Sequence, residues 1–336
     1  MLKKISIILS IIIITIIIIL GGSFCYLINQ KSVSVLEKVS VQLKWLHQAQ
    51  FAGNYVAKEK GFYADQGLDV DIIPFSYTNP TLEAVAKGDV DFGITGASEL
   101  IMAREKGMPL KAIAVIYKTI PNCLYSLKSS EINKPQDLIG KIVGLEPGVQ
   151  GEILYKVMMK KLKIDRKQIN EIEIGYDATE LITGITDVSS GYLINEPHQA
   201  IEAGYEVNII KYADYGINIY ADVLFTTEET IKNKPELVKK FVYATLEGWQ
   251  YAIEHEDEAV DFTLKYATDS TRNHEAYMLN NSIPLIHTGE EPLGWMNKDI
   301  WQDTQDMLFE QGVLEKKINI NEVFTIEFLN SVADFK

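Results

Sequence analysis

Cysteine is almost absent from this chain of 336 residues, which contains only Cys25 and Cys123. With Cys25 so near the start of the chain, the body has a single thiol, which excludes an intramolecular disulfide framework and a cysteine metal cluster. Cys123 lies within an apolar run, and we expect it to be a buried structural thiol.

Positive charge is also scarce. The net formal charge is −14, and arginine occurs only three times, at Arg104, Arg166 and Arg272. So acidic a surface repels nucleic acid, which excludes a nucleic-acid partner. Recognition of sulfonate- or nitrate-type anions often uses a cation or a dense set of donors. The scarcity of arginine therefore disfavours an anionic ligand, although helix N-termini can bind anions and keep that alternative open.

The first 30 residues are predicted to be a targeting segment. Lys3 and Lys4 precede an apolar run whose length lies between the roughly 7–15 residues of a secretory signal and the roughly 20 of a spanning helix. Cys25 follows a stretch that loosely resembles a lipoprotein box, although Phe24 is bulkier than the usual residue there. Lipidation at Cys25, an uncleaved anchor and free export all remain open. Each places the body outside the cytoplasmic membrane, because Lys3 and Lys4 stay inside.

Residues 39–73 predict a β-loop-α-β unit. Residues 39–43 alternate apolar with polar side chains, a helix is expected over 51–60, and a second strand over 68–73. Open α/β sheets present their binding groups at the carboxyl ends of the strands. The loop at this position carries aromatic and polar side chains, namely Trp45, His47, Gln48 and Gln50.

The rest of the chain predicts two α/β domains. Alternating strands and helices up to residue 117 indicate a parallel sheet with helices on both faces. The chain crosses near residues 123–128, repeats the pattern, and crosses back near 219–224 into a helical C-terminal part whose last helix is expected near 321–330. Two crossings make a hinge with a ligand cleft between the domains. The expected parts are a linker over 31–38, domain I over 39–124 and 222–336, and domain II over 125–221.

Several stretches carry a resemblance to a known family. They read L-K-W-L-H-Q-A-Q-F-A-G-N-Y-V-A-K-E-K-G-F-Y, G-L-D-V-D-I, G-D-V-D-F-G-I-T and Y-L-I-N-E-P, and the likeness covers about residues 38–330. In this order and spacing they resemble the type II periplasmic binding proteins of ABC transporters. The most similar branch binds pyrimidine precursors of thiamine and is related to hydroxymethylpyrimidine synthases; it also contains riboflavin binders and sulfonate or nitrate binders. The resemblance implies a small-molecule ligand and an ABC permease as partner.

The same superfamily contains enzymes that build the pyrimidine with a cysteine-rich run and iron. This chain has no such run. We therefore expect a binding protein rather than an enzyme, with no catalytic residue, no cofactor and no metal.

Trp45 is the first candidate ligand contact. It is expected either to stack on a planar ring or to pack in the core, and the polar neighbour Gln48 favours stacking. Phe51 and Tyr55 lie one helical turn apart and share a face, which belongs to either the core or the cleft.

Glu196 is the second candidate, together with Asn195. Both follow a predicted strand and begin a helix. A carboxylate at this position could accept from an exocyclic amine and a protonated ring nitrogen, which would select an aminopyrimidine. The alternative is an acid that simply stabilises the start of the helix.

Two small-residue turns and the second crossing complete the candidate site. Free backbone N–H groups in the turns could receive ligand oxygen atoms, or the turns could be ordinary connections. Around the second crossing, Tyr215, Tyr220 and Asp222 belong to a hinge or cleft, or to the core and surface. His287 is expected to be structural, because no other ligand lies at suitable spacing. The candidate residues of the turns are Gly96, Ser98, Gly148, Gln150 and Gly151.

The sequence thus predicts an extracytoplasmic solute-binding protein of an ABC importer that closes on a planar heteroaromatic, with a pyrimidine precursor of thiamine as the first ligand. Riboflavin and a sulfonate- or nitrate-type anion are alternative ligands. An alternative function is a membrane-anchored sensory module that binds its ligand and signals through a membrane partner.

Overall fold

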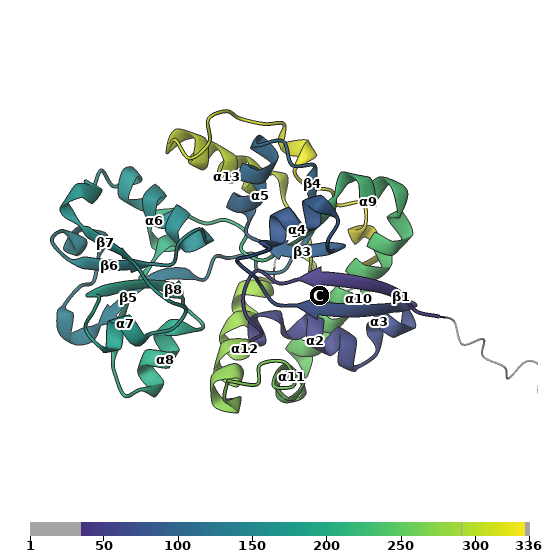
Figure 1. The fold of residues 1–336 in the computed structure, drawn as a ribbon, viewed down its shortest axis with the longest axis horizontal. Coiled ribbons are helices and arrows are strands. Elements are labelled where there is room, and N and C mark those ends of the chain that lie inside the picture. The colour runs from purple at the N-terminus through teal and green to yellow at the C-terminus, as the bar shows by residue number, and fades with distance from the viewer. Residues whose placement is uncertain (1–34, 290, 333–336) are drawn as a thin grey trace, which may run out of the picture. The chain divides into compact units, whose positions relative to one another are not determined.

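The computed structural model describes residues 35–289 and 291–332. The expected signal or anchor segment over 1–30, with Cys25, and the first half of the expected linker, residues 31–34, lie outside the described residues. From Lys38 onward the chain forms one compact unit, in which strands alternate with helices (Figure 1). Among the described residues, no helix is long and apolar enough to cross a membrane.

The first sheet has the strand order β2-β1-β3-β10-β4. Its edge strand β2 has the sequence L-D-V-D-I-I, and its Leu and Val side chains are buried while its Asp side chains are exposed. The central strand β3 is buried along its whole length. These two patterns are those of a half-covered edge and a strand covered on both faces. The strands are β1 (Glu37–Gln42), β2 (Leu68–Ile73), β3 (Phe92–Thr95), β4 (Leu110–Val115) and β10 (Val223–Thr227).

The second sheet has the order β7-β6-β8-β5-β9. Helix α6 (Gln150–Lys161) lies on one side of it, and α7 (Thr179–Ile182) and α8 (Glu196–Glu202) lie on the other (Figure 1). The strands are β5 (Asn122–Leu127), β6 (Ile142–Leu145), β7 (Asn170–Glu173), β8 (Val188–Tyr192) and β9 (Val207–Lys211). Cys123 on β5 is buried, as expected, and burial raises the pKa of its thiol.

The expected α/β fold with two sheets and a helical C-terminal part is confirmed, and β1, β3 and β4 run in one direction as expected, but the first sheet as a whole is mixed rather than parallel. Strand β10 returns from the second sheet and inserts antiparallel between β3 and β4. Strand β5 likewise pairs antiparallel with β8 and β9. Apolar periodicity identifies a strand but carries no information on its direction, so the sequence pattern could not distinguish these two crossings from parallel strands.

The remaining helices cover the first sheet and form the C-terminal part. They are α2 (Ala52–Glu59), α3 (Phe62–Asp65), α4 (Thr81–Lys87), α5 (Ala97–Glu105), α9 (Glu228–Asn233), α10 (Pro235–Glu254), α11 (Glu256–Thr263), α12 (Arg272–Ile286) and α13 (Lys298–Glu310), with the short 3-10 turn η1 (Ala49–Phe51) before α2.

The helix expected near 321–330 is absent, and two short 3-10 turns stand there, η6 (Ile320–Glu322) and η7 (Leu329–Val332). Between them the backbone pairs with Ala112 on β4: the Ala112 N–H donates to Val323 O at 2.8 Å, and the Thr325 N–H donates to Ala112 O at 2.9 Å. Because β4 is the edge of its sheet, this segment satisfies backbone groups that would otherwise be unpaired.

Helices α2 and α10 pack closely because each presents glycine at the crossing. A Cβ on Gly248 would lie 2.2 Å from the backbone oxygen of Gly53, and a Cβ on Gly53 would lie 2.2 Å from the Trp249 ring. Helix α2, which follows the loop that carries Trp45 and Gln48, is thereby held against α10, the longest helix among the described residues.

Replacing Gly248 with alanine is expected to destabilise the protein by about 1–3 kcal/mol, because the added methyl group meets backbone rather than a movable side chain. This loss should exceed the roughly 1 kcal/mol that alanine gains over glycine within a helix. Urea unfolding measures it. Gly175→Ala is the matched control, since its Cβ would meet only Glu180 Oε1 at 3.5 Å. Equal urea midpoints for Gly248→Ala and Gly175→Ala would show that α2 and α10 can move apart to accommodate the added methyl group at little cost in stability.

Candidate functional site

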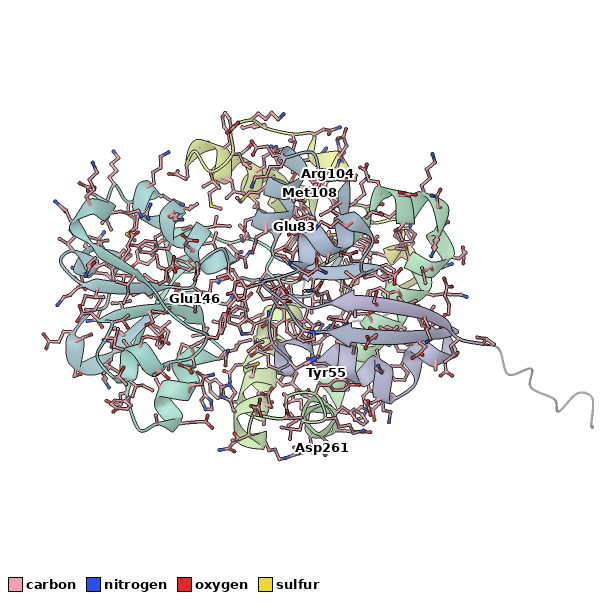
Figure 2. The ribbon with its side chains drawn as sticks, viewed as in Figure 1. Tyr55, Glu83, Arg104, Met108, Glu146 and Asp261 are labelled. Carbon is pink, nitrogen blue, oxygen red and sulfur yellow. The ribbon has the colours of Figure 1, made fainter. Side chains whose placement is uncertain are left out.

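A cavity of about 540 Å³ lies where the carboxyl ends of strands from both sheets converge. Residues following β1, β2 and β3 line it on one side, and residues following β6 and β8 line it on the other. Figure 2 labels Glu146, which directly follows β6. This is the position at which α/β sheets bind ligands. The polar and aromatic lining residues include Lys44, Trp45, Gln48, Gln50, Phe75, Tyr77, Glu83, Glu99, Glu146, Gln150, Tyr192, Asn195 and Glu196.

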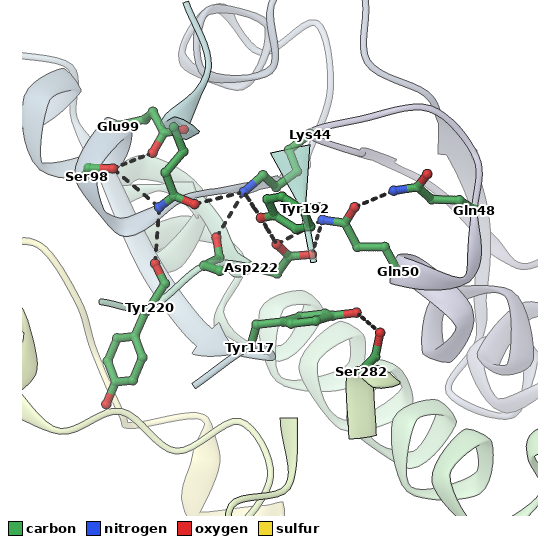
Figure 3. Close-up of polar contacts among 12 residues, drawn as sticks. Lys44, Gln48, Gln50, Ser98, Glu99, Tyr117, Tyr192, Tyr220, Asp222 and Ser282 are labelled. Carbon is green, nitrogen blue, oxygen red and sulfur yellow. Dashed lines mark hydrogen bonds and ion pairs between the residues drawn. The ribbon is translucent and has the colours of Figure 1, made fainter. Parts of the chain in front are cut away.

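Lys44 connects the two sides of the cavity. Its ammonium group donates to the Tyr192 hydroxyl at 2.9 Å and lies 3.5 Å from Asp222 Oδ1 and from Gln150 Oε1. Gln50 donates to both oxygens of Asp222, at 2.8 and 3.1 Å (Figure 3). Asp222 is fully buried, and its burial raises its pKa while Lys44 lowers it. This network lies in the cavity lining, with Asp222 buried behind it, and it connects residues that follow β1 with residues of β8 and α6.

A second chain of amide groups runs from Gln48 to Glu196. Gln48 Oε1 accepts from Asn195 Nδ2 at 3.3 Å, and Asn195 Nδ2 donates to Glu196 Oε1 at 2.6 Å. The Tyr192 N–H donates to Glu196 Oε2 at 2.7 Å. Both oxygens of Glu196 therefore already accept from protein donors, which fixes the orientation of the carboxylate.

Glu146 and Glu196 place two buried carboxylates in the same cavity. Glu146 is 5% exposed and Glu196 is 3% exposed. Burial raises the pKa of both groups, and the proximity of Glu146 raises the pKa of Glu196 further. The Ser190 hydroxyl donates to Glu146 Oε2. Buried carboxylates of this kind favour a partner that brings positive charge or N–H donors.

Glu146→Gln is expected to stabilise the protein at pH 8 and to lose that advantage as the pH falls to about 5. A carboxyl group whose folded-state pKa is raised destabilises the fold above that pKa, and the penalty disappears as the folded-state group is protonated. Glutamine can still accept from Ser190. Urea unfolding at several pH values measures the difference, with exposed Glu173→Gln as control. A pH-independent difference would mean that Glu146 is not charged in the folded protein.

Aromatic side chains form one wall of the cavity. The Trp45 and Tyr176 rings meet edge to face at 5.1 Å, Tyr176 and Tyr77 stack at 5.7 Å, and Tyr77 and Phe75 meet edge to face at 4.8 Å. Tyr77 is 50% exposed and Tyr176 is 38% exposed. Tyr176, which follows β7 of the second sheet, does not itself line the cavity but contacts both Trp45 and Tyr77. Such rings suit the faces of a flat ligand.

The structure brings some of the sequence-predicted site residues into the cavity lining. Trp45 is partly exposed there rather than enclosed in the core. The others that line it are Gln48, Gly148, Gln150, Gly151, Asn195 and Glu196.

Phe51 and Tyr55 do not line the cavity, so the core alternative holds for both. Phe51 is 1% exposed and Tyr55 is fully buried. The Tyr55 ring, labelled in Figure 2, stacks on Tyr266 at 4.5 Å, and its hydroxyl lies 3.0 Å from His47 Nδ1. The Tyr55 ring thus packs against the C-terminal part of the chain, a contact that a local spacing rule could not predict.

Gly96, Ser98, Tyr220 and Asp222 lie beside the lining rather than in it. A Cβ on Gly96 would lie 2.4 Å from Gln150 Nε2, so this glycine makes room for the Gln150 amide. Gln150 Nε2 donates to Ser98 Oγ and to Tyr220 O, each at 3.4 Å (Figure 3). These residues position Gln150 and, in the case of Asp222, Lys44.

The expectation of free backbone N–H groups in the two turns is wrong at two positions. The Gly148 N–H donates to Glu152 Oε2 at 2.9 Å, and the Ala97 N–H donates to Tyr220 O at 3.2 Å. Protein groups therefore occupy these two donors, which an anion would otherwise use. This weakens the argument for an anionic ligand at these turns.

Sequence reasoning missed Lys44, Glu146 and Tyr192, as well as the aromatic residues after β2. Lys44 and Glu146 each follow the end of a strand, Gln42 and Leu145 respectively. The rule that singled out Trp45 and Glu196 would therefore have found them as well.

The two mixed sheets, with the cavity at their converging strand ends, define the periplasmic binding protein fold. Among solved structures, the periplasmic aliphatic sulphonate binding protein SsuA from Escherichia coli aligns with a TM-score of 0.68 at 16% identity, covering 85% of this chain and 91% of that one. A protein from Bordetella bronchiseptica RB50 aligns with a TM-score of 0.70 at 19% identity, covering 88% of this chain and 97% of that one.

The chain belongs to the NMT1/THI5-like family, whose model matches residues 48–259. It is 28% identical over 306 residues to the riboflavin-binding protein RibY of Chloroflexus aurantiacus, covering 88% of this chain and 86% of that protein. It is 26% identical over 299 residues to the formylaminopyrimidine-binding protein of Halalkalibacterium halodurans, covering 86% of this chain and 90% of that protein. A 4-amino-5-hydroxymethyl-2-methylpyrimidine phosphate synthase of Legionella pneumophila is 28% identical over 233 residues, covering 68% of this chain and 73% of that protein.

Proposed function

We propose that this protein binds a small planar heteroaromatic that carries amino groups, such as a pyrimidine precursor of thiamine. The observation that carries the proposal is the pair of buried carboxylates, Glu146 and Glu196, beside an aromatic wall. An exocyclic amine or a protonated ring nitrogen would donate to these carboxylates while the ring stacks on Trp45. The formylaminopyrimidine-binding relative supports this choice of ligand.

Binding would close the two sheets on the ligand. Lys44, Gln48 and Gln150 already make hydrogen bonds across the cavity. A ligand that contacts both sides stabilises the closed arrangement over an open one. The closed form would then dock on an ABC permease at the outer face of the cytoplasmic membrane and release the ligand, without chemical turnover.

A flavin is the second candidate ligand. The cavity of about 540 Å³ is within the range of sites that enclose a drug-sized molecule. The aromatic wall would suit a large ring system, and the riboflavin-binding relative supports this alternative. A sulfonate-type anion is disfavoured, because Lys44 is the single cation among the residues that line the described cavity and it is already paired with Asp222.

Isothermal titration calorimetry on the full-length chain in mild detergent tests the proposal. Aminopyrimidines, riboflavin and an alkanesulfonate are titrated separately, and native mass spectrometry of protein purified without added ligand looks for a bound small molecule. We expect the aminopyrimidines to bind most tightly. Tightest binding of the alkanesulfonate, or turnover of an aminopyrimidine, would contradict the proposal.

The same full-length preparation distinguishes transport from sensing by its N-terminus. Mass spectrometry of protein from the membrane fraction should find either a modified Cys25 at the start of the mature chain or the intact first 30 residues. A lipidated Cys25 would support a transport component, whereas an intact anchor would favour the sensory alternative.

A further inference from the structure

Two histidines and a glutamate meet away from the cavity lining. His198 and Glu202 lie one turn apart on α8, and His274 lies near the start of α12. His198 Nδ1 is 3.1 Å from His274 Nδ1, His274 Nδ1 is 3.3 Å from Glu202 Oε2, and His198 Nδ1 is 3.8 Å from Glu202 Oε2. His274 is buried, His198 is partly buried and Glu202 is exposed, so the cluster can be reached from solvent.

Hydrogen bonds around Asn195 determine which ring nitrogen of His274 carries the proton. The other nitrogen, which faces His198 and Glu202, then carries a lone pair. The Asn195 amide nitrogen donates to the Glu196 carboxylate at 2.6 Å, so its oxygen faces His274. His274 Nε2 lies 2.9 Å from that oxygen and must donate a proton to it. In the neutral ring the other nitrogen, Nδ1, then carries a lone pair.

The three atoms that face one another are therefore all potential acceptors. The His274 Nδ1 lone pair faces the Glu202 carboxylate oxygen at 3.3 Å. A metal cation bound between these atoms would satisfy both acceptors, and imidazole nitrogen and carboxylate oxygen are ligands of transition-metal ions.

The spacing of the three atoms matches one face of a tetrahedral metal site. Zn²⁺ binds imidazole nitrogen at about 2.0–2.1 Å and carboxylate oxygen at about 2.0–2.2 Å, which puts neighbouring ligand atoms about 3.3–3.5 Å apart. The observed edges of 3.1, 3.3 and 3.8 Å bracket that value. The hydrogen bond from His274 Nε2 to the Asn195 oxygen is the kind of outer contact that orients a metal-binding imidazole.

We propose that His198, Glu202 and His274 bind a divalent transition-metal ion of the Zn²⁺ type, with water as the fourth ligand. Two imidazoles and one carboxylate suit Zn²⁺ and its neighbours, whereas Mg²⁺ and Ca²⁺ prefer all-oxygen sites. The sequence-based expectation of no metal is revised by this proposal.

A metal ion bound by His198, Glu202 and His274 would connect two helices, α8 and α12. Helix α8 follows β8 of the second sheet, whereas α12 contacts η1, where the Ala49 N–H donates to Glu275 Oε2 at 2.5 Å. The ion would join α8 to the helices that pack on the first sheet, and Asn195 connects it to the cavity lining. Occupancy should therefore favour the arrangement in which these helices are in contact.

The test uses the untagged full-length chain in mild detergent, stripped of metal and then titrated with Zn²⁺ alone and with Co²⁺ alone. We expect one ion per chain by elemental analysis, the visible absorption of tetrahedral Co²⁺, and a rise in the thermal unfolding midpoint with Zn²⁺. Mg²⁺ should give none of these responses. Because the readouts need no organic ligand, failure of the proposed ligand assignment would leave them unchanged.

Two variants make the result specific. Glu202→Gln changes an exposed side chain, and His274→Ala removes a buried ligand. Each should weaken Zn²⁺ binding by more than about tenfold, because even the loss of a residue that only hydrogen-bonds a metal ligand lowers metal affinity about 10–100-fold. His287→Ala is the control, since it removes a histidine outside the cluster. Stoichiometric Zn²⁺ binding that survives both substitutions, or no Zn²⁺ binding by the unaltered chain, would overturn the proposal.

Discussion

Replacing Lys44 with methionine is expected to destabilise the protein by about 3–5 kcal/mol. Methionine keeps most of the volume but removes the cation that lies 3.5 Å from Asp222 Oδ1. Asp222 is fully buried, and its remaining side-chain donors are Gln50 and the more distant Tyr192 hydroxyl at 3.4 Å. A buried carboxylate without its cation bears most of its desolvation penalty, which is the source of this large effect.

The Lys44→Met defect should shrink as the pH falls. Burial already raises the pKa of Asp222 in the unaltered protein, and Lys44 opposes that shift, so removing Lys44 should raise the pKa further. The penalty is present above the folded-state pKa and is relieved as the pH falls through it, because protonated Asp222 needs no cation. Urea unfolding at neutral pH and at about pH 5 measures the change.

Two further variants separate this mechanism from general damage. Lys60→Met removes a cation from an exposed pair with Glu258 and should cost no more than about 1 kcal/mol. Adding Asp222→Asn to Lys44→Met should recover part of the loss, since the unpaired charge is gone. If Lys44→Met and Lys60→Met were equally mild, the pairing of Lys44 with buried Asp222 would not contribute to the stability of the protein.

Glu146→Gln should weaken aminopyrimidine binding by about 10–150-fold, a result that rests on the proposed function. Hydrogen bonds to a charged group contribute about 1.5–3 kcal/mol, and the neutral amide loses that contribution for a protonated ring nitrogen, whose positive charge no longer meets a carboxylate. Glutamine retains the contact with Ser190, so the cavity keeps its shape. Calorimetry should find flavin binding less affected, because a neutral ring N–H can still donate to the glutamine oxygen.

Trp45→Ala provides the contrasting pattern. Loss of a stacking ring costs about 1–3 kcal/mol for a planar base, and this loss should apply to aminopyrimidines and flavins alike. Glu83→Gln, which removes another acid from the cavity lining, serves as the matched control for charge. Similar small effects of Glu146→Gln and Trp45→Ala on every ligand would place the binding site elsewhere.

The sequence predicted some of the residues changed in these variants as site residues and missed others. Trp45, Gln48, Asn195 and Glu196 were predictable because each follows a strand end, where α/β sheets expose side chains. Glu146 satisfies the same rule, since it directly follows β6. His198 and Glu202, at helical spacing, were a visible half of a metal site whose third ligand lies on a distant helix.

The sequence by itself determined the alternation of strands and helices, the two crossings and the family resemblance, because apolar periodicity and turn residues are local properties. Only the tertiary structure decided which polar groups meet. Lys44 reaches Asp222 and Tyr192 across about 150–180 residues of chain, and His274 reaches α8 from α12. Such contacts depend on strand order and direction, including the antiparallel insertion of β10, and no local pattern encodes them.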